Sequence, residues 1–191
     1  MSADPLTWFS TEREAARAAD DPMANLCTVA NVDESRQPQV RTLVLRDIDG
    51  QLAVFVNASS PKWPHLQARF AFCTYWPSLS IQYRFDVLAA PLDQTVLAAS
   101  WALRPDAPKR MDWLYELHDT QSSHIESREH LLDALRGLAV DEPLSAPPNA
   151  RGLLLEPLQI ERLDLTQANG IHDRQRFDLI DGVWQQRTLI P

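Results

Sequence analysis

The feature that most constrains the fold is a tight-turn signal between two β-rich runs. The runs cover 39–46 and 51–57, and the residues between them read Asp47-Ile48-Asp49-Gly50. Glycine accepts a positive φ without strain, so Asp-Gly between apolar runs indicates an antiparallel hairpin. We therefore predict a β-hairpin across 39–57.

The turn after this hairpin carries residues suited to an anion. Ser60 is predicted to be the N-cap of a short helix, with Pro61 as its first residue. Free backbone N–H groups at a helix start favour negative charge, and Lys62 and Arg41 add positive charge. The pattern predicts a phosphate site beside the hairpin, and the alternative is a solvated hairpin edge with ordinary surface charges.

Length and charge limit the classes of protein. The chain of 191 residues suits one domain, 1–191, with a sizeable core. The formal net charge of −8 argues against a nucleic-acid partner, because a phosphate backbone requires clustered Lys and Arg. A small anionic ligand held by a few local cations remains compatible with this charge.

Apolar segments and cysteines bear on the compartment. No apolar run is long enough to span a bilayer, and the first residues lack the basic and apolar regions of a signal peptide. We expect a cytoplasmic protein with no membrane partner. Cys27 and Cys73 lie in apolar runs, which favours reduced thiols over a disulfide, and no His/Cys cluster predicts a metal site.

The remaining pattern predicts strands, then helices, then strands. The N-terminal segment, 1–20, is predicted to form a helix over 5–20. It precedes a strand at 25–31, a short helix at 63–69 and strands at 70–76 and 79–89. A helical insertion (91–140) contains helices at 92–103, 109–117 and 126–138, the last with Leu131, Leu132, Leu135 and Leu138 facing inward. The C-terminal part (150–191) holds strands at 151–156, 158–165, 171–180 and 183–189, with hairpin turns at Asn169-Gly170 and Asp181-Gly182. This order predicts an α+β fold, a β-barrel or curled sheet with helices outside.

The sequence contains none of the common catalytic signatures. GxSxG, HExxH and a Walker loop are absent, and the few glycines exclude a Gly-rich nucleotide loop. The polar residues that remain suit an anionic cofactor that brings its own reactivity; they are Arg41, Arg46, Ser60, Lys62, Gln82, Gln121, Ser122, His172 and Arg174. Gln82 can donate to and accept from a bound ring, or it can simply belong to the polar outer face of a sheet. His172 and Arg174 are expected on one face of their strand.

Six stretches in order resemble the pyridoxamine 5′-phosphate oxidase family of FMN-binding split barrels. The stretches are RTLVLR (41–46), FVNASSPK (55–62), FCTYWPSLSIQYRFDV (72–87), LRPDAP (103–108), TQSSHI (120–125) and IHDRQRFDLIDGVWQQRTLIP (171–191). The resemblance covers about 25–191. It implies a six-stranded antiparallel, Greek-key-like barrel with flanking helices, and a homodimer with FMN at the subunit interface.

The resemblance also implies roles for individual residues. The expected FMN contacts are Arg41, Thr42, Leu43, Val44, Arg46, Phe55, Val56, Ser60, Lys62, Gln82, Gln121, Ser122 and Arg174. Arg46, Arg104 and His172 would bind a small-molecule substrate, and His172 is the catalytic candidate. Arg41, Ser60 and Lys62 would hold the FMN phosphate, while Gln121, Ser122 and Arg174 would come at least partly from the other subunit.

The chain departs from the family pattern at several positions. Pro61 replaces an Arg, Arg46 a Lys, Ser100 a Tyr, Pro108 a Ser and Gly170 an Arg, and a Trp falls near Leu163. These changes favour an FMN-dependent oxidoreductase with an unidentified substrate. Two alternatives remain open, namely a true pyridoxamine/pyridoxine 5′-phosphate oxidase and a non-catalytic module that binds flavin or another ligand.

Overall fold

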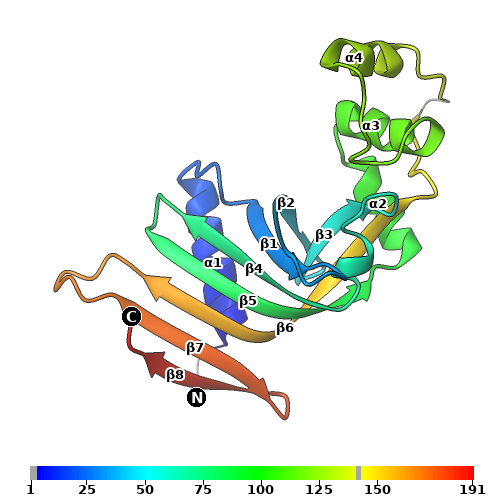
Figure 1. Ribbon diagram of the computed structural model, residues 1–191. Helices are drawn as coiled ribbons and strands as arrows, with labels where there is room; N and C mark the ends of the chain where they lie inside the picture. Colours follow the sequence, from blue (N-terminus) through cyan, green and yellow to red (C-terminus); the bar gives the residue numbers. More distant parts are fainter. Residues whose placement is uncertain (1–3, 141–142) are drawn as a thin grey trace.

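The computed structural model describes residues 4–140 and 143–191 and shows an antiparallel sheet with helices around it (Figure 1). The helices are α1 (Pro5–Ala18), η1 (Pro64–Leu66, a 3₁₀ turn), α2 (Gln94–Ala102), α3 (Asp106–Leu117) and α4 (Arg128–Arg136). The strands are β1 (Leu26–Val32), β2 (Pro38–Ile48), β3 (Gln51–Asn57), β4 (Arg69–Trp76), β5 (Ile81–Pro91), β6 (Ala150–Asp164), β7 (Asp173–Ile180) and β8 (Val183–Leu189). No described helix is both long enough and apolar enough to cross a bilayer.

The sheet closes on itself. Its strand order is β3-β2-β1-β4-β5-β6-β7-β8, and β3 also pairs with β6, so β1 to β6 form a closed six-stranded barrel. Every pairing is antiparallel, and β7 and β8 extend the sheet beyond β6. The predicted α+β fold with a six-stranded split barrel and flanking helices is confirmed.

The predicted hairpin is present as β2–β3. Asp49 and Gly50 have φ angles of 49° and 80°, the pair of positive values that a two-residue hairpin turn requires. Leu45 then pairs with Val54, and both side chains are buried inside the barrel. The local turn thus places the next residue of β2, Arg46, on the outer face.

An aromatic cluster fills the barrel, and α1 contributes to it. The Phe9 ring centroid lies 5.3 Å from that of Trp76, 5.1 Å from that of Tyr83 and 4.9 Å from that of Phe85. Pro5 stands at the start of α1, where Asp4 accepts a hydrogen bond from the next backbone N–H. Burial of this aromatic area is the main stabilisation on the α1 side of the barrel.

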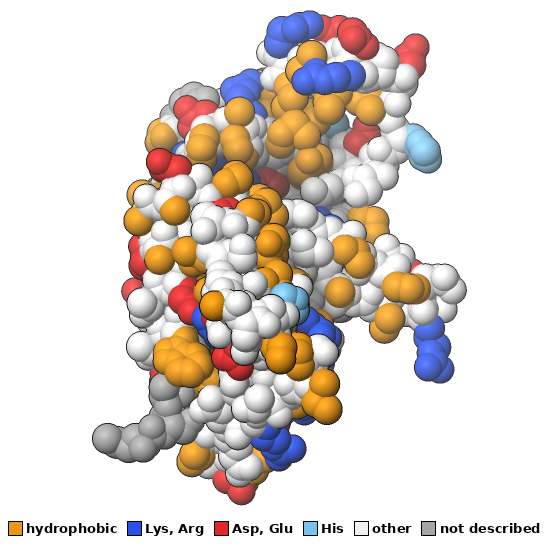
Figure 2. Space-filling view, turned by 90° about the vertical axis from the view of Figure 1, so that its left-hand side faces the viewer, with side chains coloured by type: hydrophobic (Ala, Val, Ile, Leu, Met, Phe, Trp, Pro, Cys, Tyr) orange, Lys and Arg blue, Asp and Glu red, His pale blue; other side chains and the backbone are white. Residues whose placement is uncertain are grey.

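The opposite side of the barrel is covered by α2. A second buried cluster there consists of Leu92, Leu97, Trp101 and Ala150. Gly152 allows this contact, because a Cβ at that position would lie 2.7 Å from Leu92 Cδ2. Beyond α2, the helices α3 and α4 extend away from the barrel (Figure 1). Figure 2 shows hydrophobic side chains gathered on the surface of the molecule near its upper end, the end at which Figure 1 draws these two helices.

Three local predictions are wrong in part. The helix expected at 63–69 is only the turn η1, so Ser60 caps no helix; Pro61 and Pro64 remove two backbone donors before β4 begins. The strands expected at 151–156 and 158–165 are one strand, β6, because a register shift beside Pro157, which leaves Leu158 without a partner on β5, lets the strand continue past the proline. Asn169-Gly170 lies in the longer connection between β6 and β7 instead of in a tight hairpin turn.

The leucine face of α4 is only partly covered. Leu138, which follows the helix, is 6 % exposed, whereas Leu132 is 37 % exposed. No residue within α4 is buried. The expectation that Leu131, Leu132, Leu135 and Leu138 all face a core is therefore wrong, because α4 contacts chiefly α3 and not the barrel.

Candidate functional site

The predicted phosphate residues lie around one cavity. Arg41 comes from β2, Ser60 and Lys62 from the turn after β3, and Ser122 from the loop after α3; together with neighbouring residues they line a cavity of about 350 Å³. The Lys62 Nζ donates to Ser60 Oγ at 2.7 Å and to Gln121 Oε1 at 2.8 Å. Segments far apart in the sequence therefore meet around Lys62.

Arg41 contributes a buried donor without an acceptor to this cavity. Its Nη1 atom is buried, and no described residue accepts a hydrogen bond from it. Burial lowers the pKa of the Arg41 guanidinium. Burial likewise lowers the pKa of the Lys62 amine, and the nearby charge of Arg41 lowers it further. Two neighbouring cations with an unused donor suit a bound anion, which would supply the missing acceptor.

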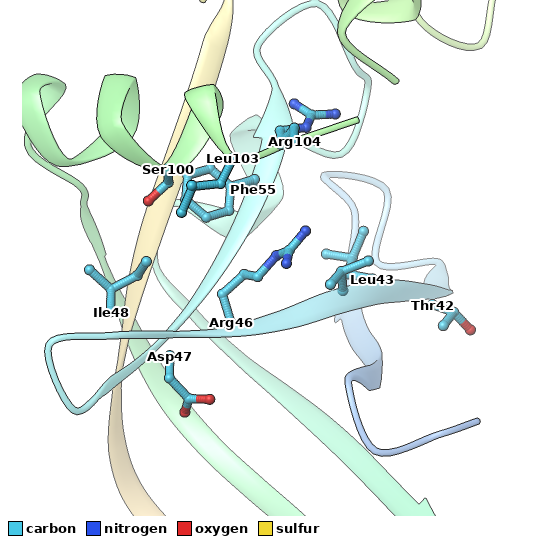
Figure 3. A pocket seen from close by; sticks show the side chains of 10 residues that line it. Thr42, Leu43, Arg46, Asp47, Ile48, Phe55, Ser100, Leu103 and Arg104 are labelled. Atoms are coloured by element: carbon cyan, nitrogen blue, oxygen red, sulfur yellow. The ribbon is translucent and has the colours of Figure 1, made fainter. Parts of the chain in front are cut away.

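A second cavity, of about 380 Å³, lies between the outer face of β2 and α2 (Figure 3). Figure 3 shows Arg46 pointing from β2 toward the side where Phe55, Leu103 and Arg104 lie. The predicted cofactor and substrate residues that line this cavity are Thr42, Leu43, Val44, Arg46, Phe55 and Arg104. The structure thus brings both predicted substrate arginines to one place.

A third cavity shares lining residues with each of the first two. It measures about 560 Å³ and shares Lys62 with the phosphate cavity and Leu43, Phe55 and Arg104 with the cavity under α2. Val56 and Gln121 also line it. The predicted cofactor residues of β2, β3 and the two loops therefore line three neighbouring cavities that share lining residues.

Two residues missed by sequence reasoning connect these cavities. Asp112 of α3 accepts from Arg104 Nη1 at 2.6 Å and from Asn57 Nδ2 at 3.3 Å. Asn57 is buried, and its Oδ1 accepts from the backbone N–H of Ser59 at 2.8 Å. The resembling stretch FVNASSPK includes Asn57, but no sequence signal links Asp112 to Arg104, because Arg104 lies in the connection between α2 and α3 and Pro105 separates it from α3.

Gln82, Arg174 and His172 lie elsewhere in the chain. Gln82 of β5 and Arg174 of β7 both pair with Leu163 of β6, so the three form a row on the outer face of the sheet. Around the barrel, β1 and β4 separate β5 from β2 on one side, and β3 separates β6 from β2 on the other. Arg174 forms an ion pair at 3.0 Å with the buried carboxylate of Glu161. His172 precedes β7 and is exposed, so the expectation that it shares a strand face with Arg174 is wrong.

Known structures define the class of this fold. An FMN-binding protein related to pyridoxamine 5′-phosphate oxidase from Nostoc punctiforme covers 100% of this chain with a TM-score of 0.82 and 21% identity. PhzG from Burkholderia lata, solved with tetrahydrophenazine-1-carboxylic acid, covers 98% of this chain with a TM-score of 0.80 and 21% identity. The fold is that of the FMN-binding split barrels related to pyridoxamine 5′-phosphate oxidase.

Sequence similarity to known proteins identifies the family. The pyridoxine/pyridoxamine 5′-phosphate oxidase of Pseudomonas fluorescens is 31% identical over 96% of this chain and 85% of its own length. The enzyme of that name from Alkalilimnicola ehrlichii is 30% identical over 93% of this chain and 91% of its own length. A search against family models found no match. At this identity and coverage, the chain belongs to the pyridoxine/pyridoxamine 5′-phosphate oxidase family.

Proposed function

We propose that the chain binds FMN and acts as an FMN-dependent oxidoreductase on a small substrate. The observation that carries the proposal is the buried Nη1 of Arg41, which has no partner in the described part of the chain and lies at a cavity lined also by Lys62 and Ser60. A buried donor without an acceptor is costly, and the phosphate of FMN would provide that acceptor. The donor set therefore fits this cofactor.

The residues of these neighbouring cavities divide into roles. Arg41, Ser60 and Lys62 would hold the phosphate, and Gln121 positions Lys62 through its 2.8 Å hydrogen bond. Leu43 and Phe55 form apolar walls that exclude water from the flavin ring. When bound, FMN supplies reversible two-electron oxidation of a substrate placed against its ring.

A second copy of the chain would complete the site. Gln82 and Arg174 lie on an outer sheet face, away from the cavities of their own protomer. The outer face of the sheet exposes apolar side chains, with Val40 67 % and Tyr75 39 % exposed, and burial of these would favour association. We propose a homodimer in which Gln82, His172 and Arg174 of one copy face the cavities of the other.

The absorbance spectrum of the purified protein tests the cofactor. After FMN addition and desalting, we expect the protein to retain a flavin spectrum. Dilution should loosen FMN, because two chains build each site, and light scattering should report a dimer. A colourless protein at saturating FMN would contradict the proposal and favour a non-catalytic binding module.

The second candidate is pyridoxamine 5′-phosphate oxidase itself. The names of the curated relatives favour it, as does the presence of Arg46 and Arg104 at one cavity. Flavin-loaded protein would then convert pyridoxamine 5′-phosphate to the aldehyde. Absence of this turnover in protein shown to hold FMN would exclude the second candidate.

A further inference from the structure

The cavity between β2 and α2 contains two arginines in different electrostatic states. Arg104 donates to Asp112 Oδ2 at 2.6 Å, and the two side chains are only 24% and 14% exposed. The Arg104 guanidinium also lies 4.6 Å from the ring centroid of Trp101. Arg46 points into the cavity, and no described residue forms an ion pair with it (Figure 3). Arg104 is therefore held by the protein itself, whereas Arg46 is available to a ligand.

The charge of the cavity follows from these contacts. Asp112, which lines the neighbouring third cavity, neutralises Arg104. Asp47, the acidic residue of this lining, is paired with Arg13 and Arg17. The described lining is left with one uncompensated positive charge, on Arg46. A dianion at this place would leave one negative charge without a protein partner, whereas a monoanion would be matched by Arg46 alone.

The remaining lining is largely apolar. It consists of Leu43, Val44, Ile48, Phe55 and Leu103, with the hydroxyl of Ser100 as a polar neighbour. A cavity of about 380 Å³ admits a ligand of one or two fused rings. An apolar body with a single anionic group would match both the walls and the charge.

We propose that this cavity selects a flat, apolar substrate with one carboxylate, held by Arg46, and that Asp112 excludes phosphate monoesters by neutralising Arg104. Planar guanidinium groups bind carboxylates through two parallel hydrogen bonds, so one free arginine suffices for a monoanion. The inference rests on the proposed function, since FMN bound in the third cavity, which Lys62 lines, would face this cavity across Leu43 and Phe55, which line both.

Two probes with the same aromatic body test the selection. We would titrate FMN-loaded protein with 2-naphthoate and with 2-naphthyl phosphate by calorimetry at about pH 8, where a phosphate monoester is a dianion. We expect naphthoate to bind about tenfold more tightly. Equal or tighter binding of the phosphate, or binding of neither probe to FMN-loaded protein, would overturn the inference.

Asp112→Asn tests the cause of the selection. The variant keeps the shape of the side chain and an acceptor for Asn57 but releases the charge of Arg104. Naphthyl phosphate should then bind about tenfold more tightly than to the unaltered protein, with a smaller change for naphthoate. Glu116→Gln is the matched control, because Glu116 is an exposed acid on the same helix, and it should change neither affinity. An unchanged preference in folded Asp112→Asn would overturn the inference.

A double variant covers the case in which Asp112→Asn does not fold. Arg104→Met with Asp112→Asn removes the pair as a unit, and naphthoate affinity should stay within about threefold, because the pair contributes no net charge. Loss of naphthoate binding would overturn the inference. Failure of every protein to bind FMN would instead overturn the proposed function, so the two failures are distinguishable.

Discussion

Arg13 and Arg41 are both arginines with buried guanidinium atoms, but they lie in different regions of the barrel and meet different surroundings. Arg13 of α1 is 1% exposed and donates to the backbone oxygens of Ala24 at 2.8 Å and Leu45 at 2.6 Å. It also forms an ion pair with Asp47 at 3.0 Å. Arg41, near the turn after β3, keeps a buried nitrogen without a described acceptor.

The difference in hydrogen-bond partners distinguishes an arginine that stabilises the fold from one that is suited to bind a ligand. A buried cation whose donors are all used stabilises the fold, because removing it leaves several acceptors unpaired. A buried cation with an unused donor destabilises the isolated protein and gains its partner only when a ligand binds. The α1 side of the barrel therefore contributes stability, and the side near Ser60 holds an unused donor that the proposed FMN phosphate would pair.

Replacement of Arg13 should have the largest effect on folding. Arg13→Met leaves the backbone oxygens of Ala24 and Leu45 without this donor and leaves Asp47 paired with Arg17 alone. We expect the free energy of unfolding to fall by about 3–5 kcal/mol. Urea denaturation measures this change. Arg187→Met, an exposed arginine on β8, is the control and should stay within about 0.5 kcal/mol. Equal effects of both replacements would remove the contrast between buried paired and exposed arginines.

Replacement of Arg41 should affect the ligand and not the fold. For Arg41→Met we expect FMN binding to weaken by about 1.5–3 kcal/mol, the range for a hydrogen bond to a charged group. The free energy of unfolding of the FMN-free protein should be unchanged or higher, because an unsatisfied buried donor is lost. Equilibrium dialysis and urea denaturation measure the two quantities. Wild-type FMN affinity in this variant would assign Arg41 to the fold and refute the phosphate site.

Asp21 is a second buried charged residue with its hydrogen-bonding partners in place, and it should make the stability of the protein depend on acid pH. The carboxylate accepts from Met23 N at 2.8 Å and from Ser78 N at 2.9 Å and Oγ at 2.6 Å. Burial raises the pKa of Asp21, but these hydrogen bonds outweigh it, so the pKa lies below its ordinary value of 3.8. We expect Asp21→Ala to lower the free energy of unfolding by about 1–3 kcal/mol near neutral pH.

The sign of the pH dependence follows from the lowered pKa. The stabilisation from Asp21 is complete above pH 3.8 and is lost as the pH falls through the lower value of the folded state. The difference between wild type and Asp21→Ala should therefore shrink on acidification. Urea denaturation below and above pH 3.8 measures it, and a constant difference would show that the charged carboxylate is not the stabilising form.

The smallest effect is expected where an ion pair is exposed. Arg136 pairs with Asp133 on α4, with side chains 72% and 65% exposed. Because water screens such a pair, Asp133→Asn should change the free energy of unfolding by less than about 0.5 kcal/mol. A larger loss would mean that pairing alone, without burial, accounts for the contribution of Arg13.

Local signals in the sequence determined the hairpin and the grouping of the residues proposed to hold the cofactor phosphate. Asp49 and Gly50 specify the turn because positive φ angles depend mainly on the residues that adopt them. The predicted group of Arg41, Ser60 and Lys62 also assembles, since β2 and the turn after β3 are neighbours once the hairpin forms. No helix begins at Ser60, however, because only the turn η1 follows.

Only the tertiary structure decided which charges are available. The pairing of Arg104 with Asp112, the unused donor of Arg41 and the separation of Gln82 from the cavities all depend on how distant segments meet. Residue type and spacing show which interactions a side chain is capable of, whereas its burial and its neighbours in the fold determine which of these interactions it forms. The sequence by itself therefore determined the family and the turn, and the fold decided which arginines stabilise the protein and which can bind a ligand.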